Sequence, residues 1–289
     1  MRAAAVLGPG LDESVLVPFR SPSTEISLLD NLFAEAVLDA LLVFGGDGTV
    51  HHQLAFAAER RIPLLVVPHG SGNDFAINMG ICDRDAALNL WRDFQAGKAN
   101  IRELDLGLIK CAQGERYFCN VAGVGLDAAA NRRANAYPRW LRGHGGYVLA
   151  ALAAMCRERS QTIEVAIASE AQQECTIWLN EPATLVAIGN TQSYGGGMRI
   201  TPRAQPDDGK LDVCFVRECA AVRLLQLFPS VFKGGHLEKP EIAYTQAQRI
   251  RITTPQPMDI YADGELAGRT PAEFSLLPRT LRVIALVSE

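Results

Sequence analysis

The stretch LLVF-GGDGTV, residues 41–50, decides the fold of the first part of the chain. Its apolar run, Leu41–Phe44, leads into three glycines within four positions, and a helical pattern covers Val50–Ala58. A short run without polar residues is typical of a strand buried in a parallel sheet. Glycine costs backbone entropy, so this turn has to bring its backbone to a place that a Cβ would block. The stretch predicts a strand, a tight turn and a helix.

The same arrangement recurs further along the chain. Leu64–Val67 is a second apolar run, PHGSGNDF follows it at residues 68–75, and Asp74–Met79 opens another helical pattern. Upstream, Ala3–Leu7 predicts a first strand, and Leu29–Ala40 has the apolar spacing of an amphipathic helix. Strands that alternate with helices favour a parallel sheet covered on both faces.

Beyond residue 101 the pattern changes to short β-like runs separated by turn residues. These runs span Tyr117–Val121, Ile163–Ala168, Cys175–Leu179, Ala183–Ile188, Leu211–Val216, Arg249–Thr253, Asp259–Tyr261, Phe274–Leu276 and Leu281–Val287. Helices are expected at Tyr147–Arg157 and Ala221–Phe232. We therefore expect an α/β domain with a parallel sheet at residues 1–110, followed by an antiparallel β-sandwich at residues 111–289. The C-terminal tail could pack back on the first domain.

Composition narrows the function classes. A net charge of −4 gives no general attraction to nucleic acid or to an anionic membrane. Seven cysteines without a C-x-x-C pair disfavour structural zinc and a disulfide framework. The longest apolar segment, Tyr147–Cys156, is about half a membrane span. These features indicate a cytoplasmic protein without a nucleic-acid partner.

Each glycine turn joins the carboxyl end of a buried strand to a helix, the edge where open α/β sheets bind ligands. Backbone N–H groups there can hold an anion, so we expect a phosphate, and a ligand-free tight turn is the alternative. Asp47 suits an anchor for a metal, a water shell or a ribose hydroxyl, and Thr49 is placed to cap the next helix. The spacings match neither a P-loop nor G-x-G-x-x-G, and the residues around Ser71 do not form a nucleophile elbow.

At this point GGDGTV and PHGSGNDFA resemble the paired signatures of the diacylglycerol kinase catalytic-domain family, which includes soluble bacterial lipid kinases and sphingosine kinases. Further matches follow in the family's order: Asp105–Gly107, NVAGVGLDA at 120–128, YGGGMRITPRAQPDDGKLDV at 194–213 and YADGE at 261–265. GGDGT alone also fits NAD kinases, whereas the later matches favour lipid kinases.

The resemblance implies transfer of the γ-phosphoryl group of ATP to a lipid hydroxyl, such as that of diacylglycerol, with Mg²⁺. It assigns nucleotide binding to Gly45, Gly46, Asp47, Gly48, Thr49, Ser71, Gly72 and Asn73. It assigns the acidic cluster that organises Mg²⁺ and water to Asp47, Asp74, Asp105 and Asp208, with backbone carbonyls of Gln205 and Lys210. Asp47 and Glu265 are the expected catalytic residues, with Glu265 as proton acceptor and Asp263 as its competitor.

Three stretches depart from the family pattern. The N-terminal stretch, which in the family carries a phosphate loop, a second strand and a nucleotide-contacting threonine, is shortened here; Gly8–Gly10 is a candidate substitute for the loop, and no threonine of this stretch is assigned to the nucleotide contact. His51 and His52 stand where Asn-Glu is common, and adjacent helical side chains diverge by about 100°, so they are not a chelating pair. His69 precedes the second turn, where a packed histidine is favoured over a nucleotide contact.

Residues Asn131–Gly146 carry four arginines and no acidic residue, together with Tyr137 and Trp140. This composition suits a lipid headgroup layer and predicts peripheral membrane contact, with a solvated loop as the alternative. The rival functions are a catalytically weak lipid- or nucleotide-binding paralogue and an NAD kinase. The sequence does not specify which lipid is the acceptor or whether the protein forms a homodimer.

Overall fold

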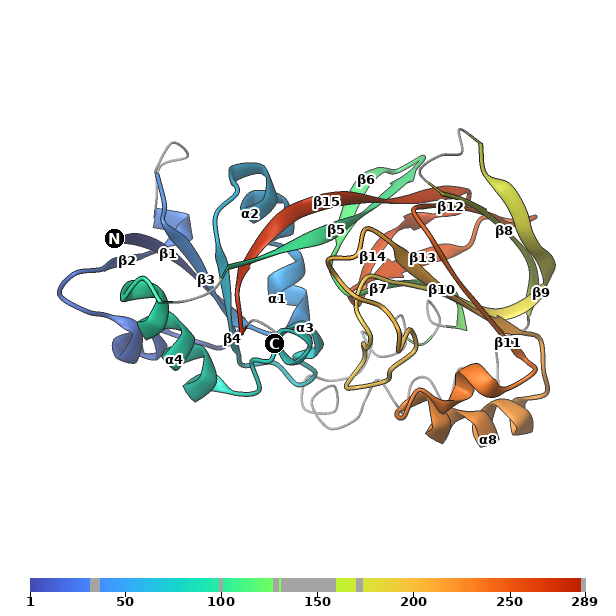
Figure 1. The fold of residues 1–289 in the computed structure, drawn as a ribbon, viewed down its shortest axis with the longest axis horizontal. Helices are drawn as coiled ribbons and strands as arrows, with labels where there is room; N and C mark the ends of the chain where they lie inside the picture. The colour runs from blue at the N-terminus through green and yellow to red at the C-terminus, as the bar shows by residue number, and fades with distance from the viewer. Residues whose placement is uncertain (32–36, 99–100, 127–129, 131–159, 170–173, 287–289) are drawn as a thin grey trace. The chain divides into compact units, whose positions relative to one another are not determined.

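The computed structural model describes residues 1–289 except 32–36, 99–100, 127–129, 131–159, 170–173 and 287–289 (Figure 1). The chain divides into two compact units, unit 1 with residues 1–104 and 279–289 and unit 2 with residues 105–278. Strands β5 (Ile101–Cys111) and β15 (Ala272–Ile284) each carry the chain from one unit into the other. The predicted Tyr147–Arg157 helix and the arginine-rich stretch Asn131–Gly146 lie outside the described residues.

Unit 1 is built on a parallel sheet in the order β15-β4-β3-β1-β2. Its own strands are β1 (Arg2–Leu7), β2 (Glu25–Leu28), β3 (Ala40–Gly45) and β4 (Leu64–Pro68). Every residue of β3 is buried, as expected for a strand that is apolar on both faces. The parallel sheet predicted from the glycine turns is therefore confirmed.

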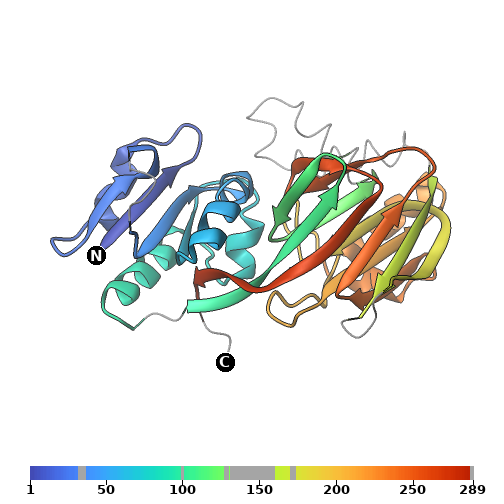
Figure 2. The same cartoon turned by 90° about the horizontal axis from the view of Figure 1, so that it is seen from above.

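Short helices connect these strands. They are η1 (Glu13–Phe19), η2 (Leu29–Asn31), α1 (Asp47–His51), α2 (Leu54–Arg60), α3 (Asp74–Asn78) and α4 (Arg84–Gln95). Helix α4, which the sequence analysis missed, begins after Asp83, whose carboxylate accepts a hydrogen bond from the Ala86 N–H at 2.8 Å. Its Trp91 is buried and donates to the Phe19 carbonyl at 2.8 Å, which anchors α4 to η1. Helix α4, drawn in teal, lies beside the sheet of unit 1 (Figure 2).

Two expectations for unit 1 were wrong. Within the predicted helix Leu29–Ala40, the described residues form a 3-10 turn at Leu29–Asn31 and a non-helical segment at 37–39, and Ala40 already begins β3. Pairing with β1 on both sides of this stretch overrides its helical spacing. Strand β2 runs to Leu28, and Arg2 and Asp39 exchange hydrogen bonds of 2.8 Å beside β1. The helix expected at Val50–Ala58 is divided into α1 and α2. In the shortened N-terminal stretch, a strand, β2, pairs with β1 in parallel.

Unit 2 is an antiparallel assembly of strands, as predicted. Besides β5 and β15 it contains β6 (Gly114–Phe118), β7 (Val121–Gly125), β8 (Gln161–Ala168), β9 (Thr176–Gly189), β10 (Leu211–Arg217), β11 (Ile242–Ala247), β12 (Arg249–Thr253), β13 (Asp259–Ala262) and β14 (Glu265–Arg269). The order is β14-β13-β7-β9-β8-β12-β15, and β10 pairs with β9 and β11. Apolar side chains that include Phe118, Phe215 and Phe274 fill its core.

Some predicted strands merge in the structure. The runs at Cys175–Leu179 and Ala183–Ile188 belong to one strand, β9, because the residues between them, Asn180–Pro182, also pair in register with β8. The register shift in this pairing lies within the first run, at Trp178. The last two runs likewise belong to β15, although its pairing partners change from β12 to β4.

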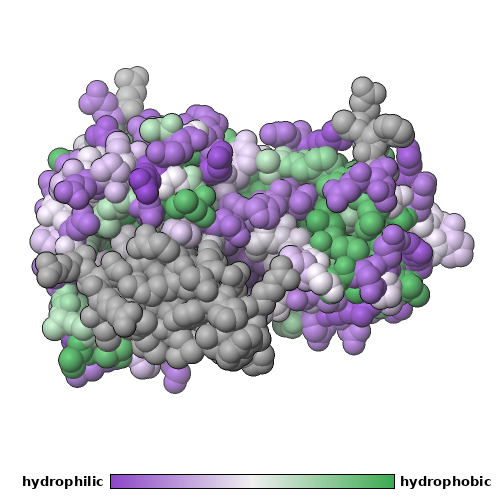
Figure 3. All heavy atoms as spheres, turned by 180° about the vertical axis from the view of Figure 1, so that it is seen from behind, coloured by the Kyte–Doolittle hydropathy of each residue, from purple (hydrophilic) through white to green (hydrophobic). Residues whose placement is uncertain are grey.

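Helix α8 (Ala221–Val231) and the 3-10 turn η4 (Gly235–Glu238) follow β10. The helix expected at Ala221–Phe232 is thereby confirmed. Leu224 and Leu227 are buried on one face of α8, whereas Val222 and Leu225 are exposed on the other. Hydrophobic side chains gather at this edge of unit 2, at the lower left of Figure 3. Within the described residues, no helix has the length and apolar character that crossing a membrane requires.

Candidate active site

Three glycine turns meet at the carboxyl ends of β1, β3 and β4 in unit 1. Gly8 donates its N–H to the Phe44 carbonyl at 2.6 Å. A Cβ on Gly46 would lie 2.9 Å from the Cα of Gly70, and a Cβ on Gly70 would lie 2.5 Å from the Cα of Gly46. Real Cβ atoms do not come so close to backbone. The first turn is therefore glycine-rich at least partly because the second turn packs directly against it.

The position of the Thr49 side chain explains why residue 45 is also a glycine. A Cβ on Gly45 would overlap the Thr49 side chain, and a Cβ on Gly8 would come within 3.1 Å of its Oγ1. Thr49 was expected to cap the helix after the turn, and this was wrong. Helix α1 begins at Asp47 after Gly46, without a side-chain cap, so Thr49 is its third residue and packs back on the glycine turns.

Asp47 ties the two turns together. Its Oδ2 accepts a hydrogen bond from the Asp74 N–H at 3.1 Å, and its Oδ1 accepts one from the Phe75 N–H at 2.9 Å. These two N–H groups belong to the first turn of α3, which lacks a side-chain cap from its own N-cap residue Asn73. The Asp47 carboxylate therefore has a structural role that the sequence did not reveal.

The second turn is closed by Asn73. The Gly70 N–H donates to Asn73 Oδ1 at 2.8 Å, and Asn73 Nδ2 donates to the Gly70 carbonyl at 2.8 Å. Asn73 has a φ of 55°, in the left-handed region that asparagine tolerates better than most residues. Ser71, at the tip of this turn, is exposed, and Gly72 is half-buried. The structure thus brings all the predicted nucleotide-binding residues to one edge of the sheet.

The three histidines near these turns have the arrangement expected from the sequence. His51 is half-buried and His52 is exposed. His69 packs against Phe44, with ring centroids 6.0 Å apart, and its Nδ1 lies 3.1 Å from the Val67 carbonyl oxygen. His69 is therefore a packed histidine that supports the start of the second turn.

The predicted metal-binding residues fall into two groups. Asp74 lies in unit 1 beside Asp47, whereas Asp105 lies in unit 2 against the loop Gln205–Lys210. Asp105 donates its N–H to the Pro206 carbonyl and accepts the Gly209 N–H through Oδ2, both at 2.7 Å. Asp105 is buried, so these two bonds fix the shape of the loop.

Asp208 is the carboxylate of this loop. Its Oδ1 accepts the Lys210 N–H at 2.9 Å, and burial raises the pKa of its carboxyl group above the ordinary value. Among the described residues, no group of three or more His, Cys, Asp or Glu side chains is arranged to hold a metal. A carboxylate with backbone carbonyls and water nevertheless fits the oxygen-rich coordination that Mg²⁺ and Ca²⁺ prefer.

The YADGE stretch forms the turn between β13 and β14. Asp263 and Gly264 adopt positive φ values of 51° and 88°. The two carboxylate oxygens of Asp263 accept the Cys119 N–H at 2.9 Å and the Asn120 N–H at 2.8 Å. Glu265 is half-buried, and within the described part of the chain no hydrogen bond or ion pair engages its carboxylate. Asp263 is thus committed to the fold, whereas Glu265 remains available for chemistry.

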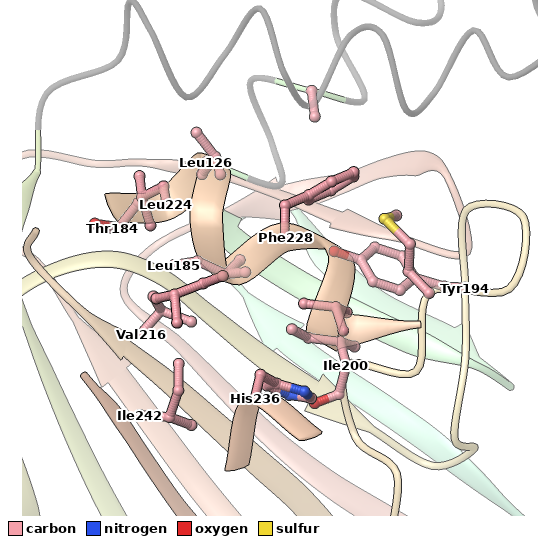
Figure 4. A pocket seen from close by; sticks show the side chains of 14 residues that line it. Leu126, Thr184, Leu185, Tyr194, Ile200, Val216, Leu224, Phe228, His236 and Ile242 are labelled. Carbon is pink, nitrogen blue, oxygen red and sulfur yellow. The ribbon is translucent and has the colours of Figure 1, made fainter. Parts of the chain in front are cut away.

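Unit 2 also contains an apolar pocket that the sequence analysis missed (Figure 4). Its volume is about 70 Å³, and its walls come from β9, β10, α8 and the segment 194–200. His236 is a polar residue in this lining; its Nε2 lies 3.0 Å from the Ile200 carbonyl oxygen, and burial lowers the pKa of its imidazole. The buried spacing Leu224, Leu227 and Val231 on α8 was the available signal, but it does not distinguish a pocket wall from core.

Comparison with known proteins agrees with this architecture. Residues 16–108 match the family described as diacylglycerol kinase catalytic domain, and residues 120–285 match the YegS C-terminal NAD kinase beta sandwich-like domain. A diacylglycerol kinase of Mycobacterium tuberculosis is 36% identical over 264 residues, covering 88% of this chain and 80% of the relative. A diacylglycerol kinase of Bacillus subtilis is 27% identical, covering 85% of this chain and 77% of the relative.

Solved structures show the same fold. The superposition on a diacylglycerol kinase structure from Bacillus anthracis covers 99% of this chain and 96% of the Bacillus chain, with a TM-score of 0.69 at 20% identity. The two family matches together cover most of both units. The Mycobacterium relative is similar over most of the chain, and its 36% identity is high enough to establish homology. The chain belongs to the diacylglycerol kinase family.

Proposed function

We propose that this protein transfers the γ-phosphoryl group of ATP to the hydroxyl of diacylglycerol or a closely related lipid. The observation that carries this proposal is the meeting of three glycine turns at the carboxyl edge of the unit 1 sheet, where backbone groups can approach phosphate oxygens closely. The proposed nucleotide-binding residues are Gly45, Gly46, Asp47, Gly48, Thr49, Ser71, Gly72 and Asn73. Gly8 adds a third backbone segment to this edge.

The proposed cation site is the loop Gln205–Lys210. The Asp208 carboxylate and the backbone carbonyls of Gln205 and Lys210 would hold Mg²⁺, and Asp105 would keep the loop in shape through its two hydrogen bonds. When bound, Mg²⁺ would neutralise charge that develops on the phosphate oxygens. Asp47 and Asp74 are the proposed unit 1 members of the acidic set.

Glu265 is the proposed proton acceptor for the lipid hydroxyl. Its carboxylate has no partner among the described residues, and the turn that carries it is tied to the Cys119–Asn120 backbone by Asp263. A base on a fixed turn can reach a bound alcohol without first breaking another contact. This arrangement supports Glu265 over Asp263 for the role.

The apolar pocket is the proposed site for part of an acyl chain. A volume of about 70 Å³ has room for roughly five groups of the size of a water molecule or a methylene. The pocket would therefore hold a segment of one chain rather than a whole diacylglycerol. Its lining is apolar apart from a few polar groups, as expected for a lipid tail.

Narrowing the pocket should change the preference for chain length. Val216→Trp, on β10, is expected to exclude about two methylenes at about 0.8 kcal/mol each, so that kcat/KM for long-chain diacylglycerol falls by roughly 10-fold. Activity on a short-chain diacylglycerol should fall much less. Val222→Trp adds the same bulk on the exposed face of α8 and is the matched control. Equal losses on both substrates would contradict the acyl-chain assignment.

Membrane contact through the arginine-rich stretch Asn131–Gly146 is also proposed, from its composition. Arg139→Glu combined with Arg142→Glu should weaken binding to anionic vesicles by roughly 1 kcal/mol per charge removed, and by more on reversal. Sedimentation with vesicles of defined phosphatidylserine content measures this. Activity on a detergent-dispersed short-chain lipid should be largely unchanged. Unaltered vesicle binding would show that the stretch is a solvated loop.

Transfer of labelled phosphate from ATP to a lipid panel tests the proposed function directly. The panel should contain diacylglycerol, a sphingoid base and a monoacylglycerol, with NAD as a separate acceptor. Phosphorylation of diacylglycerol is the expected result. Binding of ATP or lipid without transfer would favour the catalytically weak paralogue, and phosphorylation of NAD would favour the NAD kinase alternative.

A further inference from the structure

Two segments with proposed chemical roles in unit 2 are far apart in the sequence but are joined by buried hydrogen bonds. They are the loop Gln205–Lys210, which carries Asp208, and the turn Asp263–Glu265. Asn190, immediately after β9, lies between the two sets of bonds and is 1% exposed. The proposed nucleotide- and lipid-binding residues do not include it.

Toward the cation loop, Asn190 acts through Asp105. Its Nδ2 donates to the Asp105 carbonyl oxygen at 2.9 Å. Asp105 in turn donates its N–H to the Pro206 carbonyl and accepts the Gly209 N–H with Oδ2. The position of Asp208, one residue before Gly209, therefore depends on a strand segment that Asn190 holds.

Toward the Glu265 turn, Asn190 acts through the corner between β6 and β7. Its Nδ2 also donates to the Cys119 carbonyl at 3.2 Å, and its backbone N–H donates to the Asn120 carbonyl at 2.8 Å. The N–H groups of Cys119 and Asn120 are those that the Asp263 carboxylate accepts. One side chain therefore contacts the backbone segments that support both the cation loop and the turn of Glu265.

The chemistry of the side chain explains why an amide occupies this position. The Nδ2 group supplies two N–H donors to two different carbonyls, and the reversed orientation would place Oδ1 against two carbonyl oxygens. Asn190 Oδ1 is buried and has no hydrogen-bond partner within the described residues. The fold therefore accepts an unpartnered acceptor in order to keep both donors.

We propose that Asn190 is a positioning residue for phosphoryl transfer, which fixes the spacing between the Asp208 loop and the Glu265 turn. This inference rests on the proposed function for the roles of the two segments. It predicts that a disturbance at either segment is felt at the other through Asn190. A residue that only stabilised the end of β9 would not couple them.

Hydrogen–deuterium exchange of the full-length protein tests the coupling without any turnover. In the Asn190→Ala and Asn190→Asp variants, exchange should increase at residues 205–210 and at residues 261–266 together. Trp91→Phe removes a buried N–H bond to a backbone carbonyl in unit 1 and is the matched control. It should lower thermal stability without changing exchange at either segment. A change confined to residues near 190 would overturn the proposal.

The wild-type protein provides a second measurement that does not depend on how the variants fold. Added Mg²⁺ should slow exchange at 205–210 and also at 261–266. Protection at 205–210 alone would overturn the coupling. Absence of protection at 205–210 would contradict the proposed cation site instead, and the variants would still test Asn190.

Kinetics then separates positioning from stability. Asn190→Ala should lower kcat by roughly 10- to 100-fold, the scale of a small misplacement of reacting groups, while the KM for ATP stays within about twofold. A normal kcat in a folded Asn190→Ala variant would overturn the positioning role. If the wild-type protein transferred no phosphate to any lipid, the proposed function would fail, whereas the exchange result would still decide the coupling.

Discussion

Glu265→Gln is expected to lower kcat by about 10²- to 10⁴-fold while the KM for ATP stays nearly unchanged. Glutamine keeps the shape of the side chain but cannot accept the proton of the lipid hydroxyl. Glu265 is proposed to act on the lipid hydroxyl and is not among the proposed nucleotide-binding residues, so ATP affinity has no direct reason to change. Steady-state kinetics with saturating diacylglycerol, at variable ATP, measures both quantities.

Asp263→Asn is the matched variant two residues away. Asparagine keeps one acceptor but presents an N–H₂ group to one of the two backbone N–H groups at Cys119 and Asn120. We expect a loss of about 1–3 kcal/mol in the free energy of unfolding and a smaller loss of turnover than in Glu265→Gln. If Asp263→Asn abolished turnover while Glu265→Gln left it intact, Asp263 would be the base. If neither variant changed turnover, YADGE would be a structural turn and the binding-protein alternative would gain support.

Asp47→Asn is expected to lower kcat by at least ~100-fold, the scale of a lost electrostatic contact in the transition state. The structure adds a stability effect, because Asp47 accepts the N–H groups of Asp74 and Phe75 with its two carboxylate oxygens. An asparagine satisfies only one of them, which should cost about 1–3 kcal/mol. Turnover measured well below the melting temperature, together with chemical denaturation, separates the two effects.

Asp83→Asn is the control for Asp47→Asn. Asp83 accepts the Ala86 N–H at the start of α4 and therefore serves as another backbone-binding aspartate of unit 1 outside the proposed site. Its replacement should lower stability by up to ~1 kcal/mol without a large change in kcat. Near-normal turnover in folded Asp47→Asn would restrict Asp47 to the structural role that its hydrogen bonds show.

Local sequence was sufficient to predict several elements and the edge that carries the nucleotide-binding candidates. Strands β3 and β4 are apolar on both faces, and each is followed at once by glycines, so their type and their parallel pairing follow from short-range pattern. Helix α8 was predicted from its spacing in the same way. The family motifs were recognisable because their residue types and order are kept along the chain.

The sequence did not reveal what each residue of these motifs contacts. Position 46 requires glycine because the backbone of Gly70 packs against it, and Asp47 binds the backbone at the start of α3. Asp263 binds a corner more than a hundred residues upstream in the chain. Such contacts depend on which segments meet, and residue spacing carries no information about them.

By itself, then, the sequence determined the change from an α/β region to a β-rich region, the buried strands β3 and β4, and the glycine turns, because these depend on neighbours within a few residues. Tertiary structure decided that residues 37–39 are not helical and that Ala40 begins β3. It also decided that Asp263 binds the backbone of a distant corner, that an apolar pocket lies beside α8, and that Asn190 contacts the supports of two loops. The physical reason is that buried backbone groups must find hydrogen-bond partners and apolar side chains must fill space. In this chain those partners come from distant segments.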